Sequence, residues 1–451
     1  MGESCVSMTG RQRTSSSPTG PSVQGAVRRK ATPRVKTALI AAGALVACAS
    51  LAAACGVVPG ISGGSGDDTV TVMTWAPQDT SATNKPGMPA MASAYARWVN
   101  AHGGLNGRKL NVLTCNDHND YVGAAKCARL AVKKKAVAVV GSYSQFGSSF
   151  LSPLESAGIP YIGGYGLTDD EFKSVLSYPV NGGQPALLAG LGEELGKSCG
   201  PVAMVRPDTV AGDQLPVLLD SGLKAAGHTP GDDVRAAEDA TAFDSQAREA
   251  LREATANPEK KGCVVPSLDS RTGTFMDSFR RLSTEYPTVR TASVLGSVDQ
   301  SIINESGGGS GPYEGAYVTG WYPESTDKRW DPLKKVIREA AFGDNRIDPA
   351  DAGVQTTWIA YTVLKKVVDS LGGGEVTANT IRSTLDNGLK VDTGGLTPTL
   401  RWRFQDLTAV VDFPRLINSS VTFQVVRDGQ LVAARKGFVN VSKTLESTAT
   451  E

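Results

Sequence analysis

The sequence has few of the residues from which metal and redox sites are built. It contains three histidines and seven cysteines among 451 residues, and no two cysteines have the Cys-x-x-Cys spacing. Zinc sites in proteins are assembled mainly from histidines and closely spaced cysteines. We therefore expect neither a bound metal nor a cofactor.

An excess of charge of one sign is also absent. The chain has 46 Lys and Arg against 45 Asp and Glu, and the first 55 residues hold seven of the basic residues but one acid, Glu3. The remaining 39 basic and 44 acidic residues give the body of the chain a net charge of −5. A mildly acidic body lacks the basic surface that binds nucleic acid. With 40% hydrophobic residues, the chain is long enough for two globular domains.

The basic N-terminal region precedes an apolar, alanine-rich run at 37–54, which ends at Cys55. A positive segment, a short apolar segment and small residues at the cleavage point form the layout of a secretory signal. Residues 51–56 resemble a bacterial lipobox, in which the cysteine is lipidated, and Cys48 is an alternative lipidation site. An uncleaved membrane anchor is the competing interpretation, although the run is near the lower length limit for a span.

We therefore predict a signal peptide with lipobox at 1–55, with Met8 as an alternative start. A Gly- and Ser-rich segment at 56–68 is predicted to be a flexible tether. These features place the protein outside the cell, lipid-anchored on the outer face of the cytoplasmic membrane. At the other end, residues 441–451 are predicted to be a disordered tail.

Four cysteines remain in the body of the chain, Cys115, Cys127, Cys199 and Cys263. An even number of cysteines in an exported chain indicates two disulfides. Three pairings are possible, and we favour Cys115 with Cys127 and Cys199 with Cys263. The first would close a short local loop and the second a longer one.

From residue 69 the sequence alternates between apolar strands and amphipathic helices. Strands are predicted at 69–74, 109–114, 136–141, 161–162, 201–205, 262–266 and 291–295, with a hairpin at 421–433. Helices are predicted at 88–101, 121–134, 148–157, 213–226, 245–256, 274–286, 330–342, 355–371 and 378–389. This alternation is typical of α/β proteins whose parallel sheets are wound with helices on both faces. Because there are too many units for one sheet of normal size, we predict two.

The segment at 137–149 has the features of an anion site. An apolar strand ends at Gly141, and small and hydroxyl residues lead to a predicted helix start at Ser148. Free N–H groups in the first turn of a helix, together with serine hydroxyls, can hold a small anion without a cation. We therefore interpret this segment as half of a ligand site.

A family resemblance appears in the helix at 94–102 followed by the Gly-Gly-Leu-Asn-Gly-Arg motif at 103–108. Together with the acidic turn at 116–120, the strand ending in Gly141 and the segment at 157–161, it resembles the type I periplasmic binding proteins of ABC transporters, the Leu/Ile/Val-binding group. The resemblance covers residues 69–440.

The resemblance implies two doubly wound α/β lobes, joined by three crossovers, that close on a ligand in the cleft. The first lobe would hold residues 69–181 and 320–391, and the second 182–319 and 392–440. The resemblance also implies the disulfide between Cys115 and Cys127.

The resemblance further implies that hydroxyl and backbone donors of the first lobe bind the ligand carboxylate. On this sequence these donors are Ser144 and Gln145, and Tyr165 and Gly166 in the loop after the next strand. Ser144 is the side chain expected to hold the acidic end of the ligand. Trp75 is expected to form a wall of the cleft.

The second lobe departs from the family pattern. Where many relatives have an aromatic residue before a glycine, this chain has Ala211 before Gly212. Three aspartates follow second-lobe strands, namely Asp208, Asp269 and Asp299, and each could meet a ligand ammonium group. Identification of the ligand as a branched-chain amino acid does not follow from this pattern.

These observations favour a monomeric solute-binding lipoprotein that delivers a small polar ligand, an amino acid or a related amide or carboxylate, to the permease of an ABC importer. A sensor of the same fold that signals to a membrane partner is the alternative. An exported hydrolase is disfavoured, because residues 141–147 do not match the Gly-x-Ser-x-Gly nucleophile motif and few histidines could act as a base. We therefore expect a binding protein and not an enzyme.

Overall fold

The computed structural model describes residues 69–447. The predicted signal peptide at 1–55, the tether at 56–68 and both candidate lipidation cysteines lie outside the described residues. So do residues 448–451.

Strands and helices alternate along the described chain, as the sequence predicts. The strands are β1 Thr69–Trp75, β2 Lys109–Cys115, β3 Ala138–Val140, β4 Tyr161–Ile162, β5 Ser177–Tyr178, β6 Val202–Pro207, β7 Asp232–Ala236, β8 Cys263–Pro266, β9 Arg290–Val294, β10 Tyr317–Gly320, β11 Ser420–Arg427, β12 Gln430–Ala433 and β13 Val439–Asn440. The α-helices are α1 Gly87–Ala101, α2 Tyr121–Lys133, α3 Gly147–Ala157, α4 Asp170–Lys173, α5 Gly183–Ser198, α6 Gln214–Ala225, α7 Asp244–Ala254, α8 Thr272–Ser283, α9 Gln300–Glu305, α10 Asp331–Ala340, α11 Ala352–Leu371, α12 Ala378–Asp386 and α13 Ser442–Ser447. Short 3-10 turns are η1 Asp269–Arg271, η2 Gly308–Ser310, η3 Lys328–Trp330 and η4 Phe404–Asp406.

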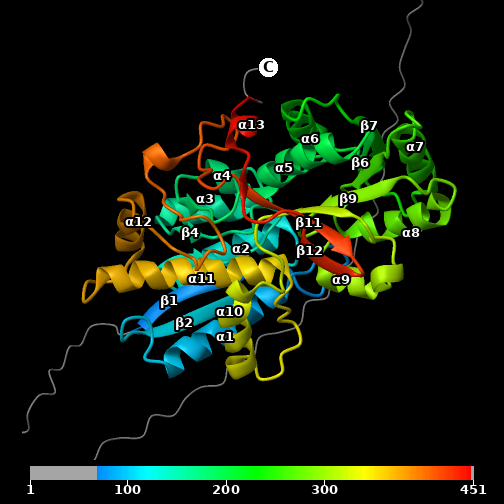
Figure 1. The fold of residues 1–451 in the computed structure, drawn as a ribbon. Coiled ribbons are helices and arrows are strands. Elements are labelled where there is room, and N and C mark those ends of the chain that lie inside the picture. Colours follow the sequence, from blue (N-terminus) through cyan, green and yellow to red (C-terminus); the bar gives the residue numbers. More distant parts are fainter. Residues whose placement is uncertain (1–68, 448–451) are drawn as a thin grey trace, which may run out of the picture. The chain divides into compact units, whose positions relative to one another are not determined.

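The first lobe is built on a parallel sheet with the strand order β2-β1-β3-β4-β5. β1 lies between β2 and β3, and its register with β2 runs from Thr69 opposite Lys109 to Trp75 opposite Cys115. On one side α1 packs against α10 and α11, which come from much later in the sequence (Figure 1). α2 and α3 pack against each other. Helices from two separate stretches of chain therefore complete this lobe.

The second lobe is built on the mixed sheet β12-β11-β10-β9-β8-β6-β7, with β13 paired to β11. β6 to β10 run parallel, whereas β11 is antiparallel to β10 and to β12. The predicted hairpin is confirmed, and its turn residues Asp428 and Gly429 both have positive φ, 52° and 71°. Positive φ at both central residues is the requirement of the tight turns that match the twist of a hairpin. The two-sheet fold class predicted from the sequence is thus confirmed.

Three segments carry the chain between the lobes, after β5, after β10 and before β11. Side chains join these segments to one another: Asn181 Nδ2 donates to the Tyr322 hydroxyl at 3.1 Å, and Asn418 Nδ2 donates to the Val180 carbonyl at 3.0 Å. Trp402 Nε1 donates to the Pro179 carbonyl at 2.9 Å. The three connecting segments are therefore hydrogen-bonded to one another and are not independent linkers.

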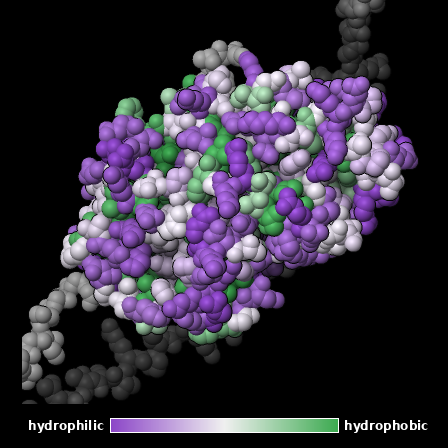
Figure 2. All heavy atoms as spheres, viewed as in Figure 1, coloured by the Kyte–Doolittle hydropathy of each residue, from purple (hydrophilic) through white to green (hydrophobic). Residues whose placement is uncertain are grey.

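Apolar side chains fill the space between each sheet and its helices. On the face seen in Figure 2, hydrophilic residues predominate and hydrophobic ones form small separate patches. None of the helices within residues 69–447 combines the length and the apolar character needed to cross a bilayer.

The C-terminal segment corrects one expectation. Residues 442–447 were predicted to be part of a disordered tail, but they form α13, which packs on α5 and α6. Leu445 is fully buried, and the Thr444 hydroxyl donates to Glu193 at 2.6 Å. A short polar segment is ordered here because another part of the fold offers it a surface and a partner.

The helix α5 was not predicted, because its sequence contains glycines that disfavour an isolated helix. In the structure, glycines of α5 and α6 lie where the two helices approach each other closely. A Cβ on Gly222 of α6 would lie 2.0 Å from the Ala189 carbonyl oxygen of α5, and a Cβ on Gly192 would lie 2.1 Å from the Leu219 carbonyl oxygen. Glycine is therefore required for contact between the two backbones.

Gly222→Ala should lower the free energy of unfolding by about 2 kcal/mol, because relieving the clash forces the helices apart. This cost outweighs the roughly 1 kcal/mol that alanine gains over glycine in a helix. Urea unfolding measures the difference. Gly373→Ala is the matched control, because a Cβ at Gly373 meets no atom within 4 Å. Equal stability of the two variants would contradict the proposed close contact.

Candidate functional site

A cavity of about 430 Å³ lies between the lobes. From the first lobe it is lined by Lys85, Tyr143, Tyr165, Gly166 and Leu167. From the second lobe and the hinge it is lined by Asp269, Thr272, Leu295, Tyr313 and Trp321, among others. Carboxyl ends of parallel strands meet at this edge in each lobe, which is where ligands bind in open α/β sheets.

Aromatic rings make one wall of the cavity. The ring centroids of Tyr143 and Tyr165 are 5.0 Å apart, and those of Tyr165 and Trp321 are 5.2 Å apart, both in edge-to-face geometry. Trp321 Nε1 donates to the Gly183 carbonyl oxygen at 2.9 Å, which fixes the orientation of the indole. Three packed rings give a rigid apolar surface against which a flat or aliphatic group can lie.

Lys85 supplies a positive charge to the cavity. Its side chain is 11% exposed, and its Nζ lies 2.9 Å from Asp351 Oδ2 and 5.6 Å from the centroid of the Tyr165 ring. Burial acts to lower the pKa of Lys85, but the Asp351 carboxylate, Tyr165 and Asp299 together raise it above its ordinary value. An ammonium group has three donors, so the single bond to Asp351 leaves others for a ligand.

Asp269 faces the cavity from the second lobe, at the start of η1, with a φ of 48°. The residue is exposed, but partial desolvation of its carboxyl acts to raise the pKa, and Arg271 acts in the opposite direction. Within residues 69–447, its carboxylate makes no hydrogen bond or ion pair. Lys85 and Asp269 therefore place opposite charges on the two lobes of one cavity.

Three of the predicted site residues, Tyr165, Gly166 and Asp269, line this cavity. Trp75 does not, because its side chain is fully buried in the core of the first lobe. Its ring packs against Phe150 at 5.4 Å and Tyr161 at 6.1 Å between centroids. The loop after β1 reaches the cavity through Lys85 instead.

In the loop that follows β3, the cavity is lined by Tyr143 and not by the predicted residues Ser144 and Gln145. Ser144 is buried, and its Oγ accepts from the Phe146 N–H at 3.3 Å. Gln145 Nε2 lies 3.4 Å from the Tyr143 hydroxyl, and it is Tyr143 that lines the cavity. Ser144 thus stabilises the turn, and Gln145 contacts the cavity residue Tyr143.

The other two aspartates lie away from the cavity lining. Asp299 is buried at the N-terminus of α9, where its Oδ1 accepts from the Ile302 N–H at 3.0 Å. Asp208 is exposed and lies 3.8 Å from Arg235. Neither aspartate is among the residues that line this cavity, although the charge of Asp299 is close enough to Lys85 to raise the pKa of that lysine.

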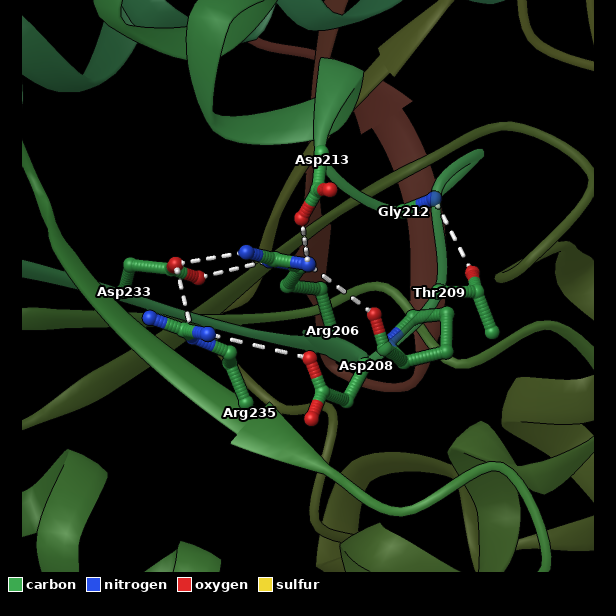
Figure 3. Close-up of polar contacts among 8 residues, drawn as sticks. Arg206, Asp208, Thr209, Gly212, Asp213, Asp233 and Arg235 are labelled. Carbon is green, nitrogen blue, oxygen red and sulfur yellow. Dashed lines mark hydrogen bonds and ion pairs between the residues drawn. The ribbon is translucent and has the colours of Figure 1, made fainter. Parts of the chain in front are cut away.

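Asp208 belongs to a second-lobe loop that Arg206 holds in place (Figure 3). The guanidinium of Arg206 makes two bonds to Asp233 of the edge strand β7, at 2.8 and 2.7 Å, and one to Asp213 at 2.7 Å. The loop closes on itself where the Gly212 N–H donates to Thr209 Oγ1 at 3.0 Å. The loop that this network holds contains Ala211, the position before Gly212 where many relatives have an aromatic residue.

Arg206→Met should lower the free energy of unfolding by about 2 kcal/mol, because Asp213 loses its cation and Asp233 keeps only the longer contact with Arg235, at 3.6 Å. The loss is smaller than for a fully buried pair, since the side chains of Asp213 and Asp233 are 63% and 30% exposed. Thermal unfolding measures it, with Arg280→Met on the exposed face of α8 as control. A variant as stable as the control would show that the network contributes nothing.

Sequence reasoning missed Lys85, Tyr143, Tyr313 and Trp321. Lys85 alone had a usable signal, since it is the one basic residue between the first strand and the first helix. Tyr313 and Trp321 lie more than 200 residues after Lys85 in the sequence. No local pattern identifies them.

Both predicted disulfides are present, Cys115 with Cys127 and Cys199 with Cys263. The first joins β2 to α2, and the second joins the end of α5 to the start of β8. In the part of the chain that the structure describes, no group of three or more metal-ligating side chains comes together.

Comparison with known proteins gives the family. The model of the family described as periplasmic binding protein matches residues 78–413, which include most of both lobes. The chain belongs to this family. Its members bind solutes outside the cytoplasm and are not catalysts, and the type I, Leu/Ile/Val-binding-like fold predicted from the sequence is confirmed. No curated protein matches the chain significantly.

Solved structures share the fold at low sequence identity. An extracellular ligand-binding receptor from Verminephrobacter eiseniae is 16% identical, with a TM-score of 0.64 over 80% of this chain and 99% of the other. A possible leucine/isoleucine/valine-binding protein from Rhodopirellula baltica is 14% identical, with a TM-score of 0.62 over 82% and 97%. An ABC transporter solute-binding protein from R. palustris, in complex with 4-hydroxybenzoate, is 14% identical, with a TM-score of 0.64 over 83% and 97%.

Proposed function

We propose that this periplasmic binding protein captures a small solute that carries a carboxylate and delivers it to an ABC importer. The observation that carries the proposal is the cavity between the lobes, with Lys85 on one lobe and Asp269 on the other. A ligand that contacts both lobes favours the closed arrangement, because its contacts are complete only when the hinge is closed.

The cavity lining suits two classes of solute. An amino acid would place its carboxylate at Lys85 and its ammonium group toward Asp269, with an apolar side chain against the aromatic wall. An aromatic acid, such as the 4-hydroxybenzoate bound by the R. palustris protein, would use Lys85 and the wall alone. The unpaired carboxylate of Asp269 favours the amino acid or a related amide, since a ligand ammonium group would pair with it when closure of the lobes removes its solvent.

The remaining features follow from this role. We propose that the chain acts as a monomer, held at the membrane by a lipid on Cys55 or Cys48, and that a permease receives the solute. The first lobe is proposed to comprise 69–181 and 320–391, and the second 182–319 and 392–440. The three hydrogen-bonded crossovers would then act as the hinge.

Calorimetric titration of the purified protein tests the proposal. The panel contains the common amino acids, their amides, benzoate and hydroxybenzoates. We expect saturable binding of at least one solute at one site per chain. Failure of every carboxylate in the panel to bind, with the protein folded by circular dichroism, would contradict the proposal.

A further inference from the structure

The carboxylate of Glu171 occupies a cluster of backbone donors behind the cavity wall. Glu171 is 2% exposed. Its Oε2 accepts from the Gly166 N–H at 3.1 Å, and its Oε1 accepts from the N–H groups of Leu167 and Thr168 at 3.0 and 3.1 Å. The Thr168 hydroxyl donates to the same Oε1 at 3.3 Å. One buried carboxylate thus receives four hydrogen bonds from three consecutive residues.

The donors belong to the segment that shapes the cavity. Gly166 and Leu167 both line it, and the Gly166 carbonyl accepts from the Gln184 N–H of α5 at 3.0 Å. Successive backbone N–H groups that converge on one point form a concave site suited to an anion. Such a site in a ligand cavity would ordinarily attract the carboxylate of the ligand, which is the role expected of Gly166 from the sequence.

We propose that Glu171 is a positioning residue that fills this anion site from within. The inference rests on the proposed function and deepens it. Because the N–H groups of residues 166–168 are already bonded to Glu171, they hold the loop in shape but are withheld from the ligand. The acidic group of the solute is therefore left to Lys85, and the protein selects for ligands whose carboxylate reaches that lysine.

Within residues 69–447, no cation forms an ion pair with Glu171. Burial raises the pKa of Glu171 to about 7, and its hydrogen bonds with the three loop residues act in the opposite direction. From β4 the Tyr161 hydroxyl faces it, and the nearby charges on its own segment are Asp169, Asp170 and Lys173, of which Lys173 pairs with Asp169 at 3.2 Å. From α3, Glu155 accepts from Ser174 instead. The loop donors thus offset part, but not all, of the cost of burying this charge.

Chemical rescue tests the anion site directly, with formate as the probe. Glu171→Ala should lower the Tm, and formate should restore most of the loss by refilling the vacated N–H cluster. The wild type and Glu155→Ala, which loses a carboxylate from the neighbouring helix, should show a smaller formate-specific gain than Glu171→Ala relative to chloride at the same ionic strength, because formate can reach only Lys85 in them. An unrescued Glu171→Ala variant would overturn the proposal.

Glu171→Gln keeps the inference testable if the alanine variant does not fold. The amide retains one acceptor but turns a donor toward the Gly166 N–H, so hydrogen exchange of that amide should become about tenfold faster, as for one lost hydrogen bond. Unchanged exchange at residues 166–168 would overturn the proposal. Because neither readout involves the solute, these failures are distinguishable from a failure of the wild type to bind any solute.

The pH dependence supplies a third readout. The pKa of Glu171 rises from 4.5 to about 7 on folding, so the folded protein retains a proton that the unfolded chain releases. Stability from this group is therefore fully present below pH 4.5 and is lost as the pH rises through 7. The Tm of the wild type minus that of Glu171→Gln should decrease over this range. A constant difference would show that the carboxyl is solvated and not enclosed by the loop.

Discussion

Removing the disulfide between Cys199 and Cys263 by alanine substitution at both positions should lower the free energy of unfolding by about 4 kcal/mol. The two cysteines are 64 residues apart, and the bond restricts a long loop in the unfolded chain. It also ties the end of α5 to the start of β8 in the centre of the second sheet. Guanidinium unfolding of the oxidised protein and the double variant measures the effect.

The other disulfide is the internal control for this prediction. Cys115 and Cys127 are 12 residues apart, so their removal should cost about 3 kcal/mol by the same loop-closure argument. The two losses should add, since the bonds lie in different lobes. A smaller loss for the long loop than for the short one would contradict the entropic account and point to effects in the folded state.

Replacing Lys85 should weaken solute binding about 100-fold, which corresponds to roughly 3 kcal/mol for a charge-assisted hydrogen bond made in a partly buried site. The variant to use is Lys85→Met with Asp351→Asn, because Lys85→Met alone would leave the Asp351 carboxylate without its partner. The methionine keeps the length and apolar stem of lysine. Calorimetric titration with the solute that binds the wild type most tightly gives the change in Kd.

Two controls separate the ligand contact from a general loss of charge. Asp351→Asn alone should bind the solute nearly as well as the wild type, since Lys85 remains. Lys436→Met removes a cation from a different cavity, beside Arg435, and should leave Kd unchanged. A Lys85 variant that binds as tightly as these controls would show that the acidic end of the solute lies elsewhere.

The elements of the fold were largely predictable, because local physical rules produce them. The hairpin turn at Asp428 and Gly429 and the parallel strands of the first sheet follow from side-chain periodicity and turn chemistry. The failures share a cause. α5 has too much glycine to be predicted as a helix, and α13 is too short and polar, yet both are ordered by surfaces that distant segments supply.

Some of the predicted site residues line the cavity, and others do not. The family resemblance named Tyr165 and Gly166, position after a second-lobe strand named Asp269, and all three line the cavity. The resemblance also named Trp75, and position after a strand named Asp208. The first is turned into the core, and the second toward Arg235 at the rim. Position after a strand does not tell which way a side chain points.

The sequence by itself therefore predicted two parallel sheets wound with helices and favoured the two disulfide pairs, and its family resemblance added the two-lobe arrangement. The sheets follow from periodicity along the chain, whereas the lobes follow from the resemblance. Only the tertiary structure decided that Lys85 is the cation of the cavity, that Trp321 closes its wall and that Glu171 fills the loop donors. Those roles arise where segments far apart in sequence meet, and burial and pairing there depend on neighbours that no local pattern specifies.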